Sequence, residues 1–491
     1  MSTLLKNVIP KTGQTVSRLG FGSYRVNQAK HAEALTAALE QGINIIDTAN
    51  NFERGNCFTI RTIHNKPCVY AGEAEKLIGN TLSHMEKEGK LSRKDVTLIT
   101  KSGYLSAQDI QSFDPSDYVQ LNEKSYHSIS PKVIEKQIGT SLERLKTNKL
   151  DIFMINSPER MLMAKNKRYT SNQLYKDLAE SFRYLDGLVH TGTIGGYGLC
   201  SNTMSFPAAA DHVALDQVIQ SCACPDHFVA IEVPFNLFER EAVIADSSQV
   251  PTVADIAKKH DVYVMTNRPL NAIANGQIRV LVNHVLGANG KGLSEQEIIN
   301  NMSQSFEAVT QLEADLMSEL PLEEESLTAK FVWGQVLSEN LARLAQNHFA
   351  TRHYLLNQVL PAVKKDIESL ESYAKELDEE LPRYQQWATK YKQSIDHLTN
   401  DIIDYAYIDT LRKNSELDRI LSALCPTLNT KENHHSPLTV KMLRFLLSHE
   451  EVGTVFTGMR DPLYVKDAMF AAKQELVDEE DLQDVWRCPI A

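Results

Sequence analysis

The sequence predicts a (β/α)8 TIM barrel of the α/β class, with a large all-helical insertion between its seventh and eighth strands. Short apolar runs alternate with amphipathic helical patterns through about the first 270 residues, which is typical of βαβ units and a parallel sheet. An eighth strand-like run follows only near the C-terminus, after a long stretch with few strand signals. Eight such units close into a barrel whose chemistry lies at the carboxyl ends of its strands.

The barrel elements follow one another in a regular order. A hairpin turn is expected at Lys11-Thr12-Gly13, directly before the first barrel strand. The eight expected strands are Val16–Gly22, Ile43–Ile46, Val96–Thr100, Leu150–Ile155, Thr193–Leu199, Val229–Val233, Val262–Thr266 and Gly453–Thr457. The helices expected between them include Lys30–Gln41, Pro131–Leu145, Thr252–His260 and Leu438–His449, with Pro and Thr suited to the helix starts where they stand.

The stretch 276–435 breaks this rhythm. It is rich in Leu, Glu, Gln, Lys and Ala, and it carries 15 Lys and Arg against 24 Asp and Glu. Helices are expected over Glu313–Leu320, Leu327–Leu344, His353–Leu377 and Tyr384–Ala423. Because the heptad pattern is irregular, a packed helical insertion is favoured over a coiled-coil hairpin. The predicted divisions are therefore 1–275 for the first part of the barrel, 276–435 for the insertion and 436–491 for the last helix-strand unit.

Composition argues against several classes of protein, including nucleic-acid-binding and membrane proteins. The 491 residues are 42% hydrophobic and carry a net charge of −12, so a surface built to bind nucleic acid is not expected. The sequence contains neither a run of 18 apolar residues nor an apolar signal-peptide core near Met1, so no membrane association is expected. Seven cysteines are spread along the chain, and Cys222 and Cys224 lack a partner pair at zinc-ligand spacing. These features predict a reduced, cytoplasmic protein without a metal site.

Two charged residues stand out at the ends of expected strands. Asp47 and Lys101 each directly end an apolar run. Burying such a pair costs several kcal/mol of desolvation unless both charges are satisfied. Two interpretations are open: an ion pair that braces neighbouring strands, or a lysine that lowers the pKa of a nearby hydroxyl donor and is held in place by the aspartate.

A set of ordered motifs then resembles the aldo-keto reductase superfamily, as a long branch with a helical insertion. The matching pieces are Leu19–Gly22, Asn44–Ala49, Gly72–Gly79, Ile99–Lys101, Ser141–Leu145, Asp151–Phe153, Ser201-Asn202 and Gly458–Arg460. The resemblance covers residues 1–275 and about 436–491. It implies reversible hydride transfer between a nicotinamide cofactor, usually NADPH, and a carbonyl carbon, with Asp, Tyr, Lys and His as the catalytic set.

The resemblance assigns catalytic positions with two departures. Asp47 and Lys101 match, but the tyrosine position falls on Phe52, and a phenyl ring cannot donate a proton. If the residues from Phe52 to Cys68 form an inserted loop, Tyr70 becomes the general acid.

The second departure is Asn156, which occupies the histidine position. An amide can donate a hydrogen bond there but cannot exchange a proton near pH 7. Tyr104 is a weaker candidate for the acid, and His64 is more simply a solvated loop residue.

The cofactor positions are better matched. Ser201 and Asn202 resemble the pair that binds the nicotinamide carboxamide, and Glu232 stands where the family has glutamine. Phe235 would either stack on the nicotinamide or pack in the core. Arg460 matches a cation near the adenosine 2′-phosphate, which favours NADP over NAD. Arg268 would add a second phosphate contact or face solvent.

We therefore expect an NADP(H)-dependent oxidoreductase that reduces an aldehyde or ketone by hydride transfer, with an atypical catalytic set. The alternative is a catalytically silent barrel that acts as a nucleotide- or protein-binding module through its acidic helical insertion. A third, weaker interpretation is an acid–base enzyme on the same barrel that no longer uses nicotinamide. The expected partner is a small carbonyl or alcohol substrate, and the insertion could serve as a lid or as a contact between copies of the chain.

Overall fold

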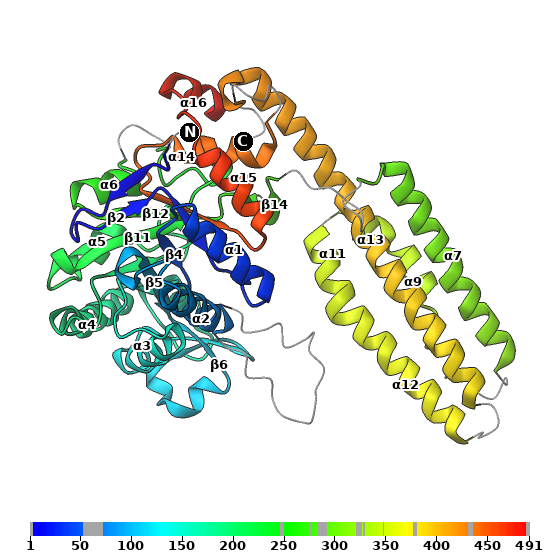
Figure 1. Cartoon of the computed structure of the whole chain (residues 1–491). Helices are drawn as coiled ribbons and strands as arrows, with labels where there is room; N and C mark the ends of the chain where they lie inside the picture. Colours follow the sequence, from blue (N-terminus) through cyan, green and yellow to red (C-terminus); the bar gives the residue numbers. More distant parts are fainter. Residues whose placement is uncertain are drawn as a thin grey trace. The chain divides into compact units, whose positions relative to one another are not determined.

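The computed structural model forms two compact units (Figure 1). The first comprises the barrel and the C-terminal part of the chain from Ile420 onward; the second runs from Asn275 to Arg419. The residues that the structure describes are 3–52, 72–245, 250–274, 276–282, 292–320, 327, 329–346, 348–376, 381–430 and 436–487.

Eight parallel strands close into a barrel, which confirms the predicted fold class. In chain order the barrel strands are β3 (Leu19–Gly22), β4 (Ile45–Asp47), β5 (Thr97–Ser102), β9 (Ile152–Asn156), β10 (Tyr197–Cys200), β11 (Phe228–Pro234), β12 (Tyr263–Asn267) and β15 (Thr454–Gly458). The last strand, β15, pairs with β12 on one side and with β3 on the other. The seam of the barrel is thus closed by the strand that lies furthest along the chain.

The expected first strand, Val16–Gly22, is divided in the structure. Residues Thr15–Ser17 form β2, which pairs with β1 (Lys6–Val8) in the predicted hairpin, and only Leu19–Gly22 joins the barrel. Ile9 and Val16 of this hairpin belong to the same buried cluster as the inward-facing residues of the barrel strands. The hairpin therefore closes the amino-terminal end of the barrel, which keeps water from the apolar ends of the strands.

Close packing explains the glycines of two matched motifs. A Cβ on Gly20 would lie 2.4 Å from the ring of Phe456 in the neighbouring strand. A Cβ on Gly79 would lie 2.4 Å from the carbonyl oxygen of Arg144 at the end of α3. Both distances are below van der Waals contact, so these positions require glycine.

Helices of the first unit cover the barrel. They are α1 (Ala29–Glu40), α2 (Glu73–Lys87), α3 (Pro131–Leu145), α4 (Ser171–His190), α5 (Leu215–Gln220), α6 (Val253–Lys259), α14 (Leu438–Leu447), α15 (Pro462–Ala472) and α16 (Glu479–Trp486). After β5 the chain adds a small antiparallel sheet that the hydrophobic pattern does not predict, made of β6 (Tyr104–Ser106), β7 (Val119–Asn122) and β8 (Ser125–His127). Two short strands, β13 (Asn271–Ala274) and β14 (Gln277–Val280), lead out of the barrel.

The second unit is helical, as predicted. Its helices are α7 (Glu295–Glu319), α9 (Trp333–Glu339), α10 (Leu341–Leu344), α11 (His348–Tyr354), α12 (Leu360–Glu376) and α13 (Leu381–Leu424). The expected helix at 313–320 is the end of the much longer α7, and the helix expected over 327–344 is broken at Asn340 between α9 and α10. Figure 1 shows α7, α12 and α13 as long neighbouring helices, and they share one apolar core.

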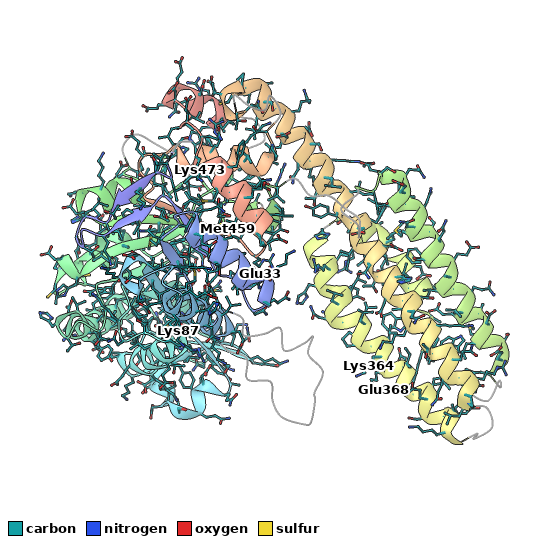
Figure 2. The ribbon with its side chains drawn as sticks, in the orientation of Figure 1. Glu33, Lys87, Lys364, Glu368, Met459 and Lys473 are labelled. Carbon is teal, nitrogen blue, oxygen red and sulfur yellow. The ribbon has the colours of Figure 1, made fainter. Side chains whose placement is uncertain are left out.

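A buried carboxylate organises this helical core. Glu313 of α7 accepts a hydrogen bond from Tyr391 of α13 at 2.6 Å and one from the Gly334 amide at 3.0 Å. The outer surface is charged instead, as Lys364 and Glu368 of α12 illustrate with an exposed ion pair of 3.5 Å (Figure 2). Within the part of the chain that the structure describes, none of the helices is both long and apolar enough to cross a membrane.

Candidate active site

A buried cluster of three charged residues lies where β4, β5 and β11 approach the carboxyl end of the barrel. Asp47 ends β4, Lys101 is the penultimate residue of β5, and Glu232 lies in β11. The ammonium of Lys101 forms an ion pair with Asp47 and a second with Glu232, at 3.0 Å from Oε2. These side chains are almost completely buried. The structure thus brings together two residues predicted to be catalytic and one predicted to bind the cofactor.

The cluster holds two carboxylates and one cation. Burial, followed by repulsion from Glu232, raises the pKa of Asp47 to about 8, although Lys101 opposes the rise. Burial by itself would lower the pKa of Lys101, but the charges of Asp47 and Glu232 together raise it above its usual range. At neutral pH the ammonium therefore stays charged, and the two carboxyl groups retain one proton between them.

Phe52 lies beside this cluster. Its ring centroid is 5.4 Å from the Lys101 nitrogen, within the range of a cation–π contact. Tyr24, which follows β3 and is largely exposed, meets the edge of the same ring at 5.4 Å between centroids. The residue at the expected tyrosine position is therefore close to the lysine but cannot donate a proton to a substrate.

Of Tyr70, His64 and Tyr104, the structure describes only Tyr104. Tyr70 and His64 lie outside the described residues. Tyr104 is the first residue of β6, where it pairs with His127 of β8. Its hydroxyl accepts a hydrogen bond from Arg160 at 3.3 Å. This pairing places Tyr104 in the small side sheet rather than in a barrel strand.

Asn156 ends β9 and is buried. Its side-chain oxygen accepts a hydrogen bond from Ser157 at 3.2 Å, and its backbone oxygen accepts one from His127 at 2.8 Å. Burial lowers the pKa of His127 to about 4, so the ring is neutral at pH 7. Its Nε2–H donates the hydrogen bond to the Asn156 carbonyl oxygen. No sequence signal places this histidine near the site, because it comes from the unpredicted side sheet.

A polar network surrounds Asn202, directly after β10. Its side-chain amide donates to Glu159 at 3.0 Å, and its oxygen accepts from Arg268. Arg268 also pairs with Glu239 at 3.0 Å. Arg268 is partly buried, and it joins the loops that follow β10, β11 and β12. Ser201, next to Asn202, is buried and accepts a hydrogen bond from the Thr203 amide at 3.2 Å.

Glu232 has a partner that the sequence did not indicate. Asn267, the last residue of β12, donates its side-chain amide to Glu232 Oε1 at 2.7 Å. The other end of this amide, Asn267 Oδ1, is buried without a hydrogen-bond partner among the described residues. Such an atom is an unmet acceptor, suited to a ligand with an N–H donor.

Phe235 follows β11 and is fully buried. Its ring meets those of His449 and Trp486 at 5.1 and 6.0 Å between centroids. This environment favours the core-packing alternative for Phe235 over stacking on a cofactor.

Arg460 is exposed and lies between β15 and the start of α15. Asp461 caps that helix and forms an ion pair with Lys30. Burial, followed by the positive charge of Arg460, lowers the pKa of His31. A guanidinium beside a helix N-terminus is a favourable place for a phosphate.

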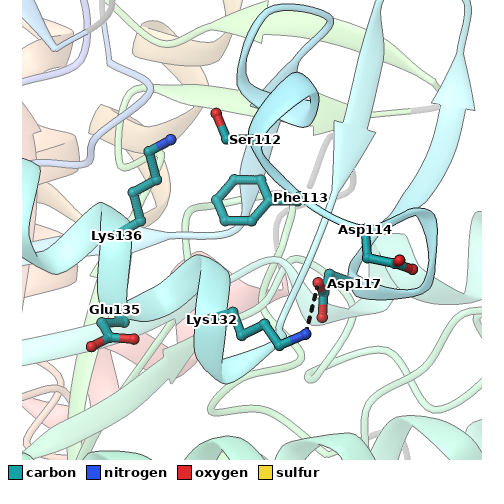
Figure 3. A pocket seen from close by; sticks show the side chains of 7 residues that line it. All are labelled: Ser112, Phe113, Asp114, Asp117, Lys132, Glu135 and Lys136. Atoms are coloured by element: carbon teal, nitrogen blue, oxygen red, sulfur yellow. Dashed lines mark hydrogen bonds and ion pairs between the residues drawn. The ribbon is translucent and has the colours of Figure 1, made fainter.

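An open cavity of about 400 Å³ lies elsewhere, between the start of α3 and the segment that connects β6 to β7 (Figure 3). Phe113 lines it, with Lys132 and Lys136 on α3, and Lys132 pairs with Asp117 at 3.4 Å. The charged cluster around Lys101 does not line this cavity.

The fold and this site define the class: a (β/α)8 barrel with a buried lysine and carboxylates at the carboxyl ends of its strands. The profile of the Aldo/keto reductase family matches residues 17–279, more than half of the chain. The chain belongs to the aldo/keto reductase family, which confirms the resemblance found in the sequence.

Individual relatives are distant. Aldo-keto reductase YhdN of Bacillus subtilis is 24% identical over 241 residues, covering 48% of this chain and 54% of that protein. The NADH-specific methylglyoxal reductase of Escherichia coli is 26% identical over 153 residues, covering 29% of this chain and 39% of that protein. The chain thus spans about half, or less, of the length of these curated relatives.

Among solved structures, the holo form of aldo-keto reductase AKR11C1 from Bacillus halodurans aligns with a TM-score of 0.50 and 14% identity. The alignment covers 99% of this chain and 96% of that one. At this identity the likeness bears on the fold.

Proposed function

We propose that the chain is an NADP(H)-dependent oxidoreductase that reduces an aldehyde or ketone by hydride transfer, with an atypical catalytic set. The observation that carries the proposal is the buried Lys101, ion-paired with both Asp47 and Glu232 at the carboxyl end of a barrel of this family. A buried ammonium that cannot easily lose its proton stabilises negative charge developing on a nearby oxygen.

The residues around the cluster fit a nicotinamide cofactor. The cofactor would supply the hydride. Ser201, Asn202 and the unmet oxygen of Asn267 offer polar groups that suit a carboxamide, and Arg460 at the start of α15 suits a 2′-phosphate. Because Arg268 is engaged by Glu239 and Asn202, its proposed role becomes that of holding the Asn202 side chain in place.

The source of the proton for the carbonyl oxygen is the unusual part of this catalytic set. Tyr70 is the proposed acid, since Phe52 next to Lys101 has no proton to give. The proton retained by Asp47 and Glu232 is a second candidate, since burial and repulsion between the two carboxylates keep it bound up to a pH near 8, so that it is present at neutral pH. Asn156 would orient the carbonyl by a hydrogen bond.

Titration of the purified protein with NADPH and with NADH tests the cofactor proposal. We expect micromolar binding of NADPH that weakens in Arg460→Ala. A carbonyl screen then follows, with Tyr70→Phe and Tyr104→Phe as a matched pair. Loss of turnover in Tyr70→Phe alone assigns the acid to Tyr70, loss in Tyr104→Phe alone assigns it to Tyr104, and turnover retained in both variants assigns it to the carboxyl pair. A folded protein that binds neither nucleotide would refute the reductase and favour the silent-barrel alternative, in which the acidic helical insertion binds a protein.

A further inference from the structure

A second cluster of reactive side chains lies at the amino-terminal end of the barrel, opposite the charged cluster. Asp186 is near the end of α4, while Cys224 and His227 lie between α5 and the start of β11. One candidate ligand atom from each of these residues lies within 4.8 Å of the other two. The group combines a thiol, an imidazole and a carboxylate, which are the three side-chain types that bind zinc.

We propose that Asp186, Cys224 and His227 form a binding site for a divalent zinc-like cation, with water completing the coordination. Tetrahedral zinc, with bonds of about 2.0–2.3 Å, holds its ligands roughly 3.3–3.8 Å apart. Side-chain rotations are therefore enough to close the group around an ion. Sulfur and nitrogen ligands select zinc-like ions over magnesium or calcium.

The present hydrogen bonds show how the ion would enter. His227 Nδ1 donates to Asp186 Oδ1 at 2.8 Å, so one proton now lies between imidazole and carboxylate. The ion would replace the proton between His227 Nδ1 and Asp186 Oδ1, and the ring would then carry its proton on Nε2. The Cys224 thiol would release its proton to solvent, and no electron would be transferred. A thiolate, a carboxylate and a neutral imidazole together carry two negative charges, which balance a divalent cation.

The surroundings of the cluster favour a cation. The site lies near the C-terminus of α4, a helix of 20 residues, where the helix dipole attracts positive charge. Tyr197, at the start of β10, donates its hydroxyl to Asp186 at 3.0 Å and fixes the carboxylate. A hydrogen bond to a ligating carboxylate is the kind of outer contact that orients metal ligands.

The loop that carries two of the ligands is anchored. Lys11 of the amino-terminal hairpin donates to the backbone oxygens of Pro225 and Phe228, at 2.7 and 3.1 Å. His190 donates through Nδ1 to the backbone oxygen of Asp186 at 2.6 Å, and its ring meets that of His227. Pre-positioned ligands lose less entropy when they close around an ion.

Metal binding to the full-length protein tests the proposal. Protein freed of metal with a chelator and kept reduced would be titrated with Co²⁺ and then with Zn²⁺. We expect thiolate-to-cobalt charge-transfer absorption and the visible bands of tetrahedral cobalt, both abolished by Zn²⁺. Because the chain has seven cysteines, the variants rather than the stoichiometry locate the site.

Loss of a hydrogen bond that supports a metal ligand lowers metal affinity by about 10- to 100-fold. Because Cys224→Ser and His227→Gln each remove a ligand itself, each should weaken Co²⁺ binding by more than this. Cys224→Ser should also remove the charge-transfer band. Cys425→Ser and the surface variant His84→Ala are matched controls that should bind as the unmodified protein does. Circular dichroism checks that each variant is folded. Absence of cobalt binding by the folded protein, or binding that Cys224→Ser and His227→Gln leave unchanged, would overturn the proposal.

Discussion

Replacing Asp47 by asparagine should change how the stability of the barrel depends on pH. In the folded protein the pKa of Asp47 is raised from 3.8 to about 8. Between these values the folded state holds a proton that the unfolded state has lost, so stability falls as pH rises. The slope is roughly 1.4 kcal/mol per pH unit, and the whole window amounts to roughly 6 kcal/mol. The asparagine side chain of the variant cannot titrate, and Lys101 keeps Glu232 as a partner.

The assay needs a reporter in the barrel unit. The chain has three tryptophans, and Trp486 alone belongs to the barrel unit, where it packs against Phe445 at 4.7 Å between ring centroids. In a Trp333→Phe/Trp387→Phe background, urea unfolding followed by Trp486 fluorescence gives the barrel's free energy of unfolding from pH 5 to pH 8. The protein with Asp47 should lose stability relative to Asp47→Asn as pH rises. A difference between the two that stays constant over this range would refute the shared-proton cluster.

Three further results are expected. Lys101→Met should lower carbonyl turnover by about 100- to 1,000-fold while NADPH binding, measured by calorimetry, is kept, because charge on the oxygen is no longer stabilised. Arg460→Ala should weaken NADPH binding by roughly 10- to 100-fold and leave NADH binding unchanged in the same titration, since one charged contact to a phosphate is lost. Glu313→Gln should destabilise the helical unit by about 1–3 kcal/mol in urea unfolding followed through Trp387, because the charge is lost and Oε2, which also accepts from the Gly334 amide at 3.2 Å, is replaced by an NH2 group that cannot accept; Glu307→Gln, exposed on the same helix, is the control.

The barrel was predictable because its signals are local. Each strand is a short apolar run, and the order of strands and helices sets the topology. The boundary at Ser17 was missed because a single residue, Arg18, separates β2 from β3, and only pairing with β1 shows where β2 ends. The side sheet after β5 was missed for the related reason that its strands are three or four residues long and alternate weakly.

The site was predictable only where a residue ends a barrel strand. Asp47 and Lys101 meet because β4 and β5 are neighbours in the barrel, so register brings their ends together. The contacts of Arg268 are with Glu239 and Asn202, which come from other loops and have no fixed spacing from it. The same applies to Cys224 and His227, whose third partner lies on another helix. Spacing rules detect ligands on one segment, not those joined by tertiary packing.

The position of β15 has a consequence for how the protein is made. Until Thr454–Gly458 has been synthesised, β12 and β3 each present an unpaired strand edge. At about 5–20 residues per second, a ribosome needs roughly 10–40 s to travel from the end of β12 to the start of β15. During that interval the helical unit can fold on its own core, while the open barrel has an exposed edge that could pair with other chains. Chaperone demand during synthesis should therefore be set by this delay rather than by the stability of the finished barrel.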